Sequence, residues 1–114
     1  MSMDPVQSNP RHYRVIFENE RVRVLEYTDH PGDETTPHKH PDSVMITLSS
    51  FRRQLRAGGT EVEVELQAGS ARWLDAQEHS GNNVGETDTH VMFVELKEAM
   101  PSDAQGPARL GPSD

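Results

Sequence analysis

The chain has 114 residues, with 11 lysines and arginines against 19 aspartates and glutamates, a formal net charge of −8, and no cysteine. This length allows one domain, and the lack of thiols excludes disulfide bonds and thiolate metal sites. The negative charge argues against nucleic acid or an anionic membrane surface as a partner, and no apolar stretch approaches the roughly 20 residues of a membrane-spanning helix.

Apolar residues are distributed unevenly along the chain. Val, Ile, Leu and Phe make up 22 of 114 residues, or about 19%, which is close to the disordered range at this net charge. Between residues 13 and 97 they make up 20 of 85, or about 24%, and five of the eight prolines lie outside this stretch. We therefore predict a folded domain over residues 12–98 between flexible tails at 1–11 and 99–114. The N-terminal tail is polar and lacks an apolar signal core, so we expect a cytoplasmic protein.

The folded part has the pattern of an all-β protein. Residues 61–66 alternate glutamate with valine or leucine, as a half-buried strand requires. In chain order, strands are predicted over residues 13–17, 21–24, 44–48, 51–56, 61–66, 71–74 and 90–96. Gly58-Gly59 predicts a hairpin, and the run 80–83 predicts a turn. Several short strands at regular spacing indicate a barrel or sandwich.

His38 and His40 stand two residues apart in an extended segment flanked by prolines. On a strand, this spacing places both rings on one face with Cα atoms about 6.6 Å apart. Two imidazoles in this arrangement can both reach one metal ion, because each needs a bond of about 2.0–2.1 Å. On the pair alone, two surface histidines in a proline-rich loop are an equally good interpretation.

The context of this pair resembles the cupin superfamily. Residues 32–40 read G-x5-H-x-H, the opening of the first cupin motif. Residues 69–83 resemble the second motif, G-x5-P-x-G-x2-H-x3-N, with His79 as its histidine and Asn83 as its asparagine. The resemblance covers nearly all of residues 13–97. It implies a double-stranded β-helix, the small jelly-roll barrel of cupins, with His38, His40 and His79 as ligands of one metal.

Two departures from the motifs bear on the site. The first motif normally continues to a glutamate, which would stand at position 44 or 45, and these positions hold Val44 and Met45. Counting by twos from His40 predicts that Val44 takes the place of this fourth ligand and supplies no donor. In the second motif, Asp75 and Gln77 replace the proline and glycine, and the spacing is one residue shorter.

A site of three neutral histidines leaves the charge of the metal uncompensated and up to three coordination positions open. Within the cupins, such sites resemble those of thiol and diketone dioxygenases. The resemblance implies a metal-dependent enzyme for a small anionic or chelating molecule, with an Fe(II)-dependent oxygenase as the favoured activity and Zn, Mn or Ni as other possible metals. A ligand-sensing module without turnover is an alternative, and a metal-dependent isomerase or lyase is a third. Small cupins often pair edge strands, so we expect a homodimer.

Other side chains are weaker candidates for the site. His90 shares the phase of Met92 and Val94, and if that face points inward it is a candidate fourth metal donor or catalytic proton shuttle; a hydrogen-bonded residue at the strand end is the other interpretation. Arg52 belongs to a cluster with Arg53 and Arg56 that could attract a carboxylate substrate, although arginines beside a hairpin are commonly solvated.

Arg72 and Trp73 are also candidate substrate contacts, because they precede the second motif. For Trp73, packing in the core is the other interpretation.

Overall fold

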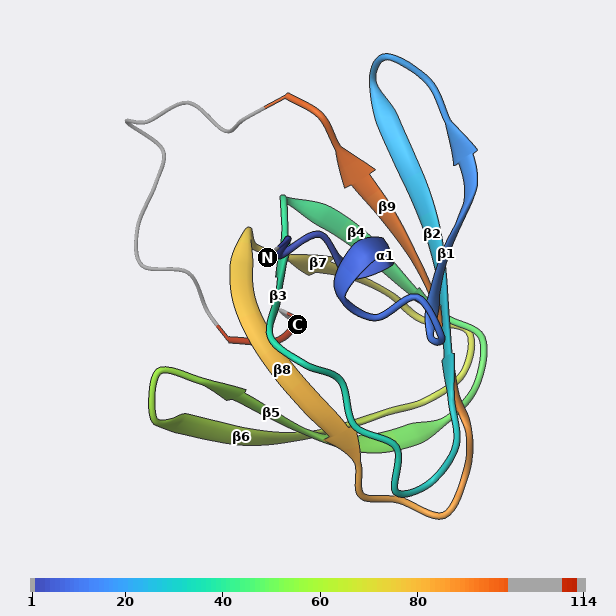
Figure 1. Cartoon of the computed structure of the whole chain (residues 1–114). Helices are drawn as coiled ribbons and strands as arrows, with labels where there is room; N and C mark the ends of the chain where they lie inside the picture. The colour runs from blue at the N-terminus through green and yellow to red at the C-terminus, as the bar shows by residue number, and fades with distance from the viewer. Residues whose placement is uncertain (1, 99–109, 113–114) are drawn as a thin grey trace.

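The computed structural model describes residues 2–98 and 110–112. These residues form antiparallel strands and one short helix (Figure 1). In chain order the elements are α1 (Pro5–Ser8), β1 (Tyr13–Glu18), β2 (Val22–Asp29), β3 (His38–His40), β4 (Ser43–Thr47), β5 (Phe51–Ala57), β6 (Thr60–Leu66), β7 (Ala71–Leu74), β8 (Gln77–Asn83) and β9 (Thr89–Leu96). The all-β fold class predicted from the sequence is confirmed.

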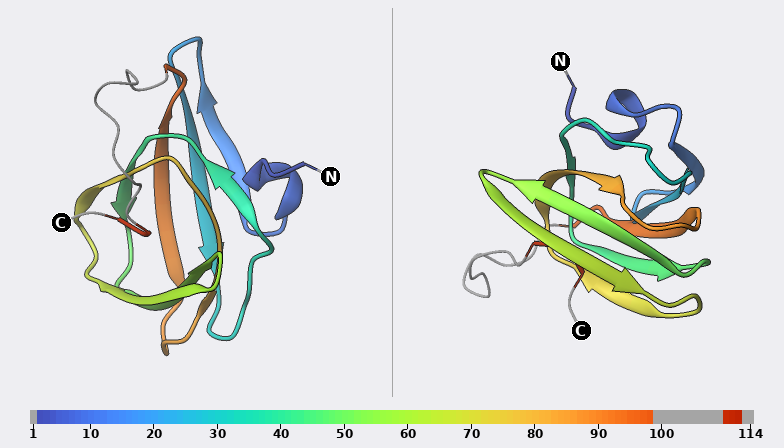
Figure 2. Two further views of the ribbon diagram at one scale, coloured as in Figure 1. Left: turned by 90° about the vertical axis from the view of Figure 1, so that its left-hand side faces the viewer. Right: turned by 90° about the horizontal axis from the view of Figure 1, so that it is seen from below.

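Two antiparallel sheets face each other and enclose the core (Figure 2). The larger sheet has the strand order β1-β2-β9-β4-β7, and the smaller one has the order β3-β8-β5-β6. Neighbours in each sheet come from distant parts of the chain: β9 lies between β2 and β4, and β3 pairs with β8. This order brings β3, which carries His38 and His40, into direct contact with β8, which carries His79.

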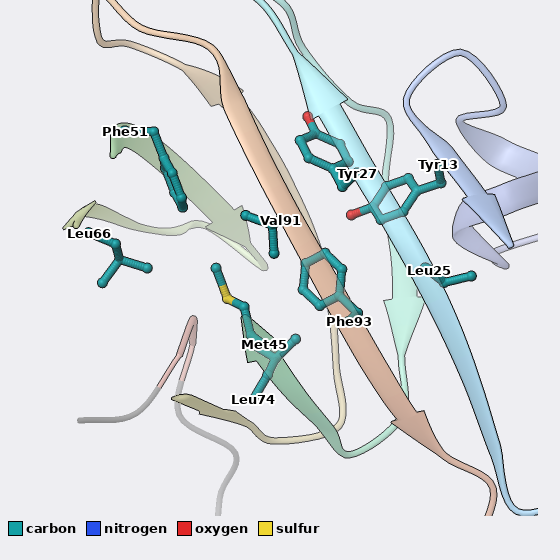
Figure 3. Packing of buried hydrophobic residues seen from close by; sticks show 9 residues of the cluster. All are labelled: Tyr13, Leu25, Tyr27, Met45, Phe51, Leu66, Leu74, Val91 and Phe93. Atoms are coloured by element: carbon teal, nitrogen blue, oxygen red, sulfur yellow. The ribbon is translucent and has the colours of Figure 1, made fainter. Parts of the chain in front are cut away.

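The core consists of aromatic and aliphatic side chains that both sheets direct inward (Figure 3). Leu25 is fully buried and Val91 is 1% exposed, so these positions on β2 and β9 lie at the centre of the larger sheet. The buried cluster comprises Tyr13, Leu25, Tyr27, Met45, Phe51, Leu66, Leu74, Val91 and Phe93. A barrel of this size needs only alternate residues of each strand to be apolar, so a modest apolar content is sufficient.

The hairpin between β5 and β6 is where the sequence predicts it. Gly58 and Gly59 both have positive φ values, 53° and 85°, which glycine adopts without steric cost. Along β6, Glu61, Glu63 and Glu65 are exposed, so these acidic side chains coat the outside of the barrel.

Strand β8 was missed because its sequence contains turn residues. The run 80–83 predicts a turn, and this prediction is wrong: these residues continue the strand to Asn83. Gly81 is required here by close approach of the backbone of β5, since a Cβ at this position would lie 2.9 Å from the carbonyl oxygen of Gln54 and 2.9 Å from a methyl of Leu55. Glycine in a strand interior commonly marks such an approach.

The described part of each tail contacts the barrel. Helix α1 packs against β1 and β3, and the backbone N–H of Lys39 donates to the carbonyl of Met3 over 2.7 Å. At the other end, Pro112 forms a β-bridge with Leu74. The predicted C-terminal tail lies mostly outside the described residues, and the flexibility of both tails stays a prediction. The strands extend over residues 13–96, within the predicted domain.

None of the described residues belongs to a helix with the length and apolar character needed to cross a membrane.

Candidate metal centre

Strands β3 and β8 bring three histidines together. His38 and His40 alternate with the exposed Lys39 on β3, so both rings point inward. His79 lies directly opposite His38 in the register of β8. The ring centroids are 4.9 Å apart for His38–His40, 5.0 Å for His38–His79 and 5.1 Å for His40–His79. One nitrogen of each ring lies within 4.8 Å of the other two, and all three residues are buried, so the cluster can serve one metal ion.

The rings of His38 and His79 are each oriented by a hydrogen-bond acceptor at the Nδ1 atom. The Nδ1 atom of His38 lies 2.7 Å from the carbonyl oxygen of Thr36, and that of His79 lies 2.7 Å from the side-chain oxygen of Gln77. Because each acceptor requires a proton on Nδ1, the lone pair of each ring stands on Nε2. Metal-binding histidines are commonly held in this way, by an acceptor on the nitrogen that does not bind the metal.

The third ring faces a buried carboxylate. The Nδ1 atom of His40 lies 3.6 Å from Oε2 of Glu95, whose side chain is 3% exposed. Within the described part of the chain, neither Nδ1 of His40 nor Oε2 of Glu95 has a hydrogen-bond partner. The other oxygen of Glu95 accepts from Arg23 over 2.8 Å, and the guanidinium of Arg23 donates two further bonds to Asp4. A charged chain thus connects the residue preceding α1 with the back of a histidine ring.

Burial keeps the three imidazoles neutral. Desolvation lowers the pKa of His38 and His79, in the latter to about 2, and lowers that of His40 well below its ordinary value. The neighbouring histidines add to the lowering for His40 and His79, because one positive ring disfavours another. Neutral imidazole is the form that binds metals, so at neutral pH the cluster is ready to coordinate an ion.

The histidines border a small cavity inside the barrel. Its volume is about 50 Å³, several times the roughly 10–15 Å³ that one water molecule needs. His38 and His79 lie on its wall together with aliphatic and aromatic core residues, and Pro112 lines it from the C-terminal end. A space of this size suits an ion with a small ligand.

A buried ion pair lies at the same cavity. Arg53 is 7% exposed and lines the wall, and its guanidinium donates to the carboxylate of Asp29. Asp29 also accepts from the hydroxyl of Tyr27 and the amide of Asn83. The charge of Arg53 is therefore balanced inside the protein, which makes it a polar wall residue with a fixed partner.

The position of the missing glutamate is occupied by Met45. The prediction that Val44 faces the site is wrong, because the chain bends between β3 and β4 and the alternation does not carry through. In β4 the buried residues are Ser43, Met45 and Thr47, and Met45 lines the cavity. A thioether replaces the carboxylate at this point of the wall.

The structure places His90 away from the three histidines. On β9 the buried residues are Thr89, Val91, Phe93 and Glu95, so the inward face is the opposite of the one that the proton-shuttle prediction assumed. The Nε2 atom of His90 lies 2.7 Å from Oε2 of Glu26, and its side chain is 38% exposed. A catalytic role for His90 has no support from this position.

The three predicted substrate contacts also lie outside the cavity wall formed by the described residues. Arg52 is exposed and donates to the carbonyl of Val84, and Trp73 donates from Nε1 to Asp75. Arg72 is half-buried on β7. These positions do not bring them to the histidines, and their contact with a substrate stays a prediction.

Two residues at the site, Tyr13 and Glu95, have no prediction from the sequence, and Arg53 is predicted only as part of an arginine cluster that could attract a carboxylate substrate. A signal for Arg53 exists, because Phe51 and Leu55 flank it at a spacing of two and so predict an inward side chain. No such signal exists for Glu95, since both faces of β9 are apolar apart from their ends.

Comparison with known proteins agrees on the fold. No protein-family model and no curated protein matches the sequence. Among solved structures, a cupin domain from Bordetella pertussis Tohama I is 28% identical with a TM-score of 0.70, covering 75% of this chain and 92% of that chain. A protein with a double-stranded β-helix domain from Klebsiella pneumoniae is 24% identical with a TM-score of 0.58, covering 77% and 78%. The polyketide cyclase RemF from Streptomyces resistomycificus is 20% identical with a TM-score of 0.55, covering 78% and 66%.

Fold and site together define a β-barrel domain with a buried three-histidine group suited to a metal ion. The chain is a small domain of the cupin superfamily, as its two sequence motifs predict.

Proposed function

We propose that this cupin binds one divalent transition metal through His38, His40 and His79 and acts on a small anionic or chelating organic molecule. The observation that carries the proposal is the convergence of three buried, neutral imidazoles, each with an acceptor facing its Nδ1 atom. The single hydroxyl proton of Tyr13 can serve only one of the Nε2 atoms of His38 and His40, whereas a metal ion satisfies all three rings at once.

The charge and size of the site support the class of substrate. Three neutral histidines leave the double positive charge of the ion uncompensated, which favours an anionic ligand. The cavity of about 50 Å³ limits that ligand to a few non-hydrogen atoms at the metal. Val91 and Phe93 make part of the wall apolar, and apolar surroundings strengthen charge interactions.

For the reaction we favour oxygenation with Fe(II), in line with the resemblance to three-histidine cupin dioxygenases; Zn, Mn and Ni are the other candidate metals. Bound iron supplies coordination positions for a chelating anion and for dioxygen. The protein's own contribution is to hold the ion through neutral rings, to orient those rings through their Nδ1 atoms and to line the cavity mainly with apolar side chains.

Elemental analysis of protein purified without added metal tests the site. We expect about one equivalent of a transition metal in the wild type and less than about 0.2 in His38→Ala/His40→Ala. His12→Ala is the matched control, because the side-chain interactions of this half-buried ring with other described residues are limited to the backbone carbonyl of Thr28 and the ring of Tyr27. Equal metal content in the wild type and the double variant would refute the site.

Oxygen consumption by iron-loaded protein tests the reaction. Uptake with thiols, diketones or hydroxy acids would support the oxygenase, and its absence across that panel favours a module that binds a ligand without turnover. One observation favours this second function: besides two of the histidines, the only ionisable side chains on the described cavity wall are Tyr13, Tyr27 and Arg53. None of them is a ready general base at neutral pH.

A homodimer stays a prediction. It is supported by Val15, Ile16 and Phe17, which are 41–53% exposed on β1, the edge strand of the larger sheet.

A further inference from the structure

Tyr13 is the one buried residue of β1. The five residues that follow it on the strand are all exposed, whereas Tyr13 is 5% exposed and its ring points into the barrel (Figure 3). The ring is held by Tyr27 at 4.7 Å and Phe93 at 6.0 Å between centroids. Because Tyr13 is the one inward side chain of this edge strand, we expect its phenol group to have a specific role inside the barrel.

The hydroxyl of Tyr13 stands between two of the histidines. Its oxygen lies 3.2 Å from Nε2 of His38 and 3.3 Å from Nε2 of His40. Both distances are long for a hydrogen bond from a hydroxyl, which is usually about 2.7–2.8 Å. They match the separation of two ligands on one tetrahedral ion, which is about 3.3–3.4 Å for bonds of 2.0–2.1 Å.

Counting protons leads to the same conclusion. With its Nδ1 proton directed at Thr36, His38 presents a lone pair on Nε2, and His40 does so when its proton faces Glu95. Tyr13 has one hydroxyl proton, so it can serve only one of these two acceptors. Among the described residues, its hydroxyl has no hydrogen-bond partner besides them. A cation among the three atoms satisfies every lone pair.

We propose that Tyr13 is a fourth protein ligand of the metal, bound through its phenolate oxygen. This inference rests on the proposed metal site. On binding, the O–H bond of the phenol breaks, an oxygen–metal bond forms and the proton leaves to solvent. The phenolate supplies the single negative charge that the glutamate of the first cupin motif would otherwise bring, from a different strand.

A dication in contact with a phenol oxygen favours loss of the phenol proton, as it does for other acidic ligands. The phenolate reduces the net charge of the centre to +1, and a substrate that binds the ion then raises the number of its ligands above four.

Tyr27 provides a matched control. The chain has two tyrosines, both in the core cluster with exposures of 5% and 3%. The hydroxyl of Tyr27 donates to Asp29 and not to a histidine. Tyr13→Phe and Tyr27→Phe therefore remove the same oxygen from equally buried rings, and only the first removes it from the metal.

The experiment loads the whole chain with one equivalent of Fe(II) without oxygen and oxidises it to the ferric state with ferricyanide. A tyrosinate ligand gives ferric iron a strong visible charge-transfer band, whose excitation enhances tyrosinate ring modes in the resonance Raman spectrum. We expect both signals in the wild type and in Tyr27→Phe, and neither in Tyr13→Phe.

Zinc affinity is the second readout, measured by competition with a chromophoric chelator. Tyr13→Phe should weaken it at least about tenfold, the lower end of the loss on removing an outer-sphere partner, and Tyr27→Phe should not. If wild-type protein retains iron without tyrosinate modes, or if the band persists in Tyr13→Phe, the role of Tyr13 is wrong while the three-histidine site stands. If the wild type retains neither iron nor zinc, the metal site itself fails. Should Tyr13→Phe not fold, the band in Tyr27→Phe alone assigns the ligand, because only Tyr13 then remains.

Discussion

Three buried imidazoles should make the metal-free protein sensitive to mild acid. The pKa values of His38, His40 and His79 are lowered by burial, whereas in the unfolded chain each is about 6.5. Below that pH the unfolded state binds more protons than the folded state, so the free energy of unfolding decreases as the pH falls. Each histidine contributes at most about 1.4 kcal/mol per pH unit.

Between pH 6.5 and 5.5, partial protonation reduces this figure to about 1 kcal/mol for each ring, or about 3 kcal/mol for all three. This is an upper limit, because Glu95 and His30, whose pKa values are raised, act in the opposite direction. A loss of this size is a large part of the roughly 5–15 kcal/mol that stabilises a typical domain.

Urea unfolding with a chelator present, at intervals of half a pH unit, measures this loss. His79→Gln should reduce it by about one third, since one of the three groups is removed, and His12→Gln should leave it unchanged. A loss below about 1 kcal/mol for the wild type, or one that His79→Gln does not reduce, would refute the assignment of three neutral buried rings.

Two further substitutions test the structure around the site. Glu95→Gln should weaken zinc binding about 10- to 100-fold, because the amide orients the ring of His40 less strongly than a carboxylate; a chelator competition that returns the wild-type affinity contradicts this role. Gly81→Ala should destabilise the protein by about 1–3 kcal/mol, since its methyl group would press on the backbone of Gln54 and on Leu55. Chemical denaturation measures this, and a variant as stable as the wild type would show that β5 and β8 can separate at no cost.

The histidine cluster could be predicted because each of its residues belongs to a short, recognisable stretch of sequence. A spacing of two on a strand places His38 and His40 on one face, and the second motif supplies His79. The remaining parts of the site depend on contacts between distant strands. Tyr13 is 25 residues from His38, and Glu95 is 55 residues from His40, so no spacing rule connects either pair.

The sequence predicts the wrong inward-facing side chains on both β4 and β9, and the reason is similar in the two strands. Val44 was placed inward by carrying the alternation of His40 across a bend that separates two strands of different sheets. On β9, His90 and Glu95 are on opposite faces, and because nearly every residue between them is apolar the sequence does not distinguish these faces. A strand with one polar face, such as residues 61–66, leaves no such ambiguity.

The contacts of the N-terminal segment have a practical consequence for experiments on shortened chains. Met3 binds the backbone of the ligand strand, Asp4 completes the charged chain that ends at His40, and the side-chain amide of Asn9 donates over 3.2 Å to the carbonyl of Thr36, which is the acceptor of His38. Deleting the first nine residues would therefore remove contacts that help to position the metal ligands His38 and His40. A variant without them would report on a weakened metal centre, and a bulky fusion placed there would carry the same risk.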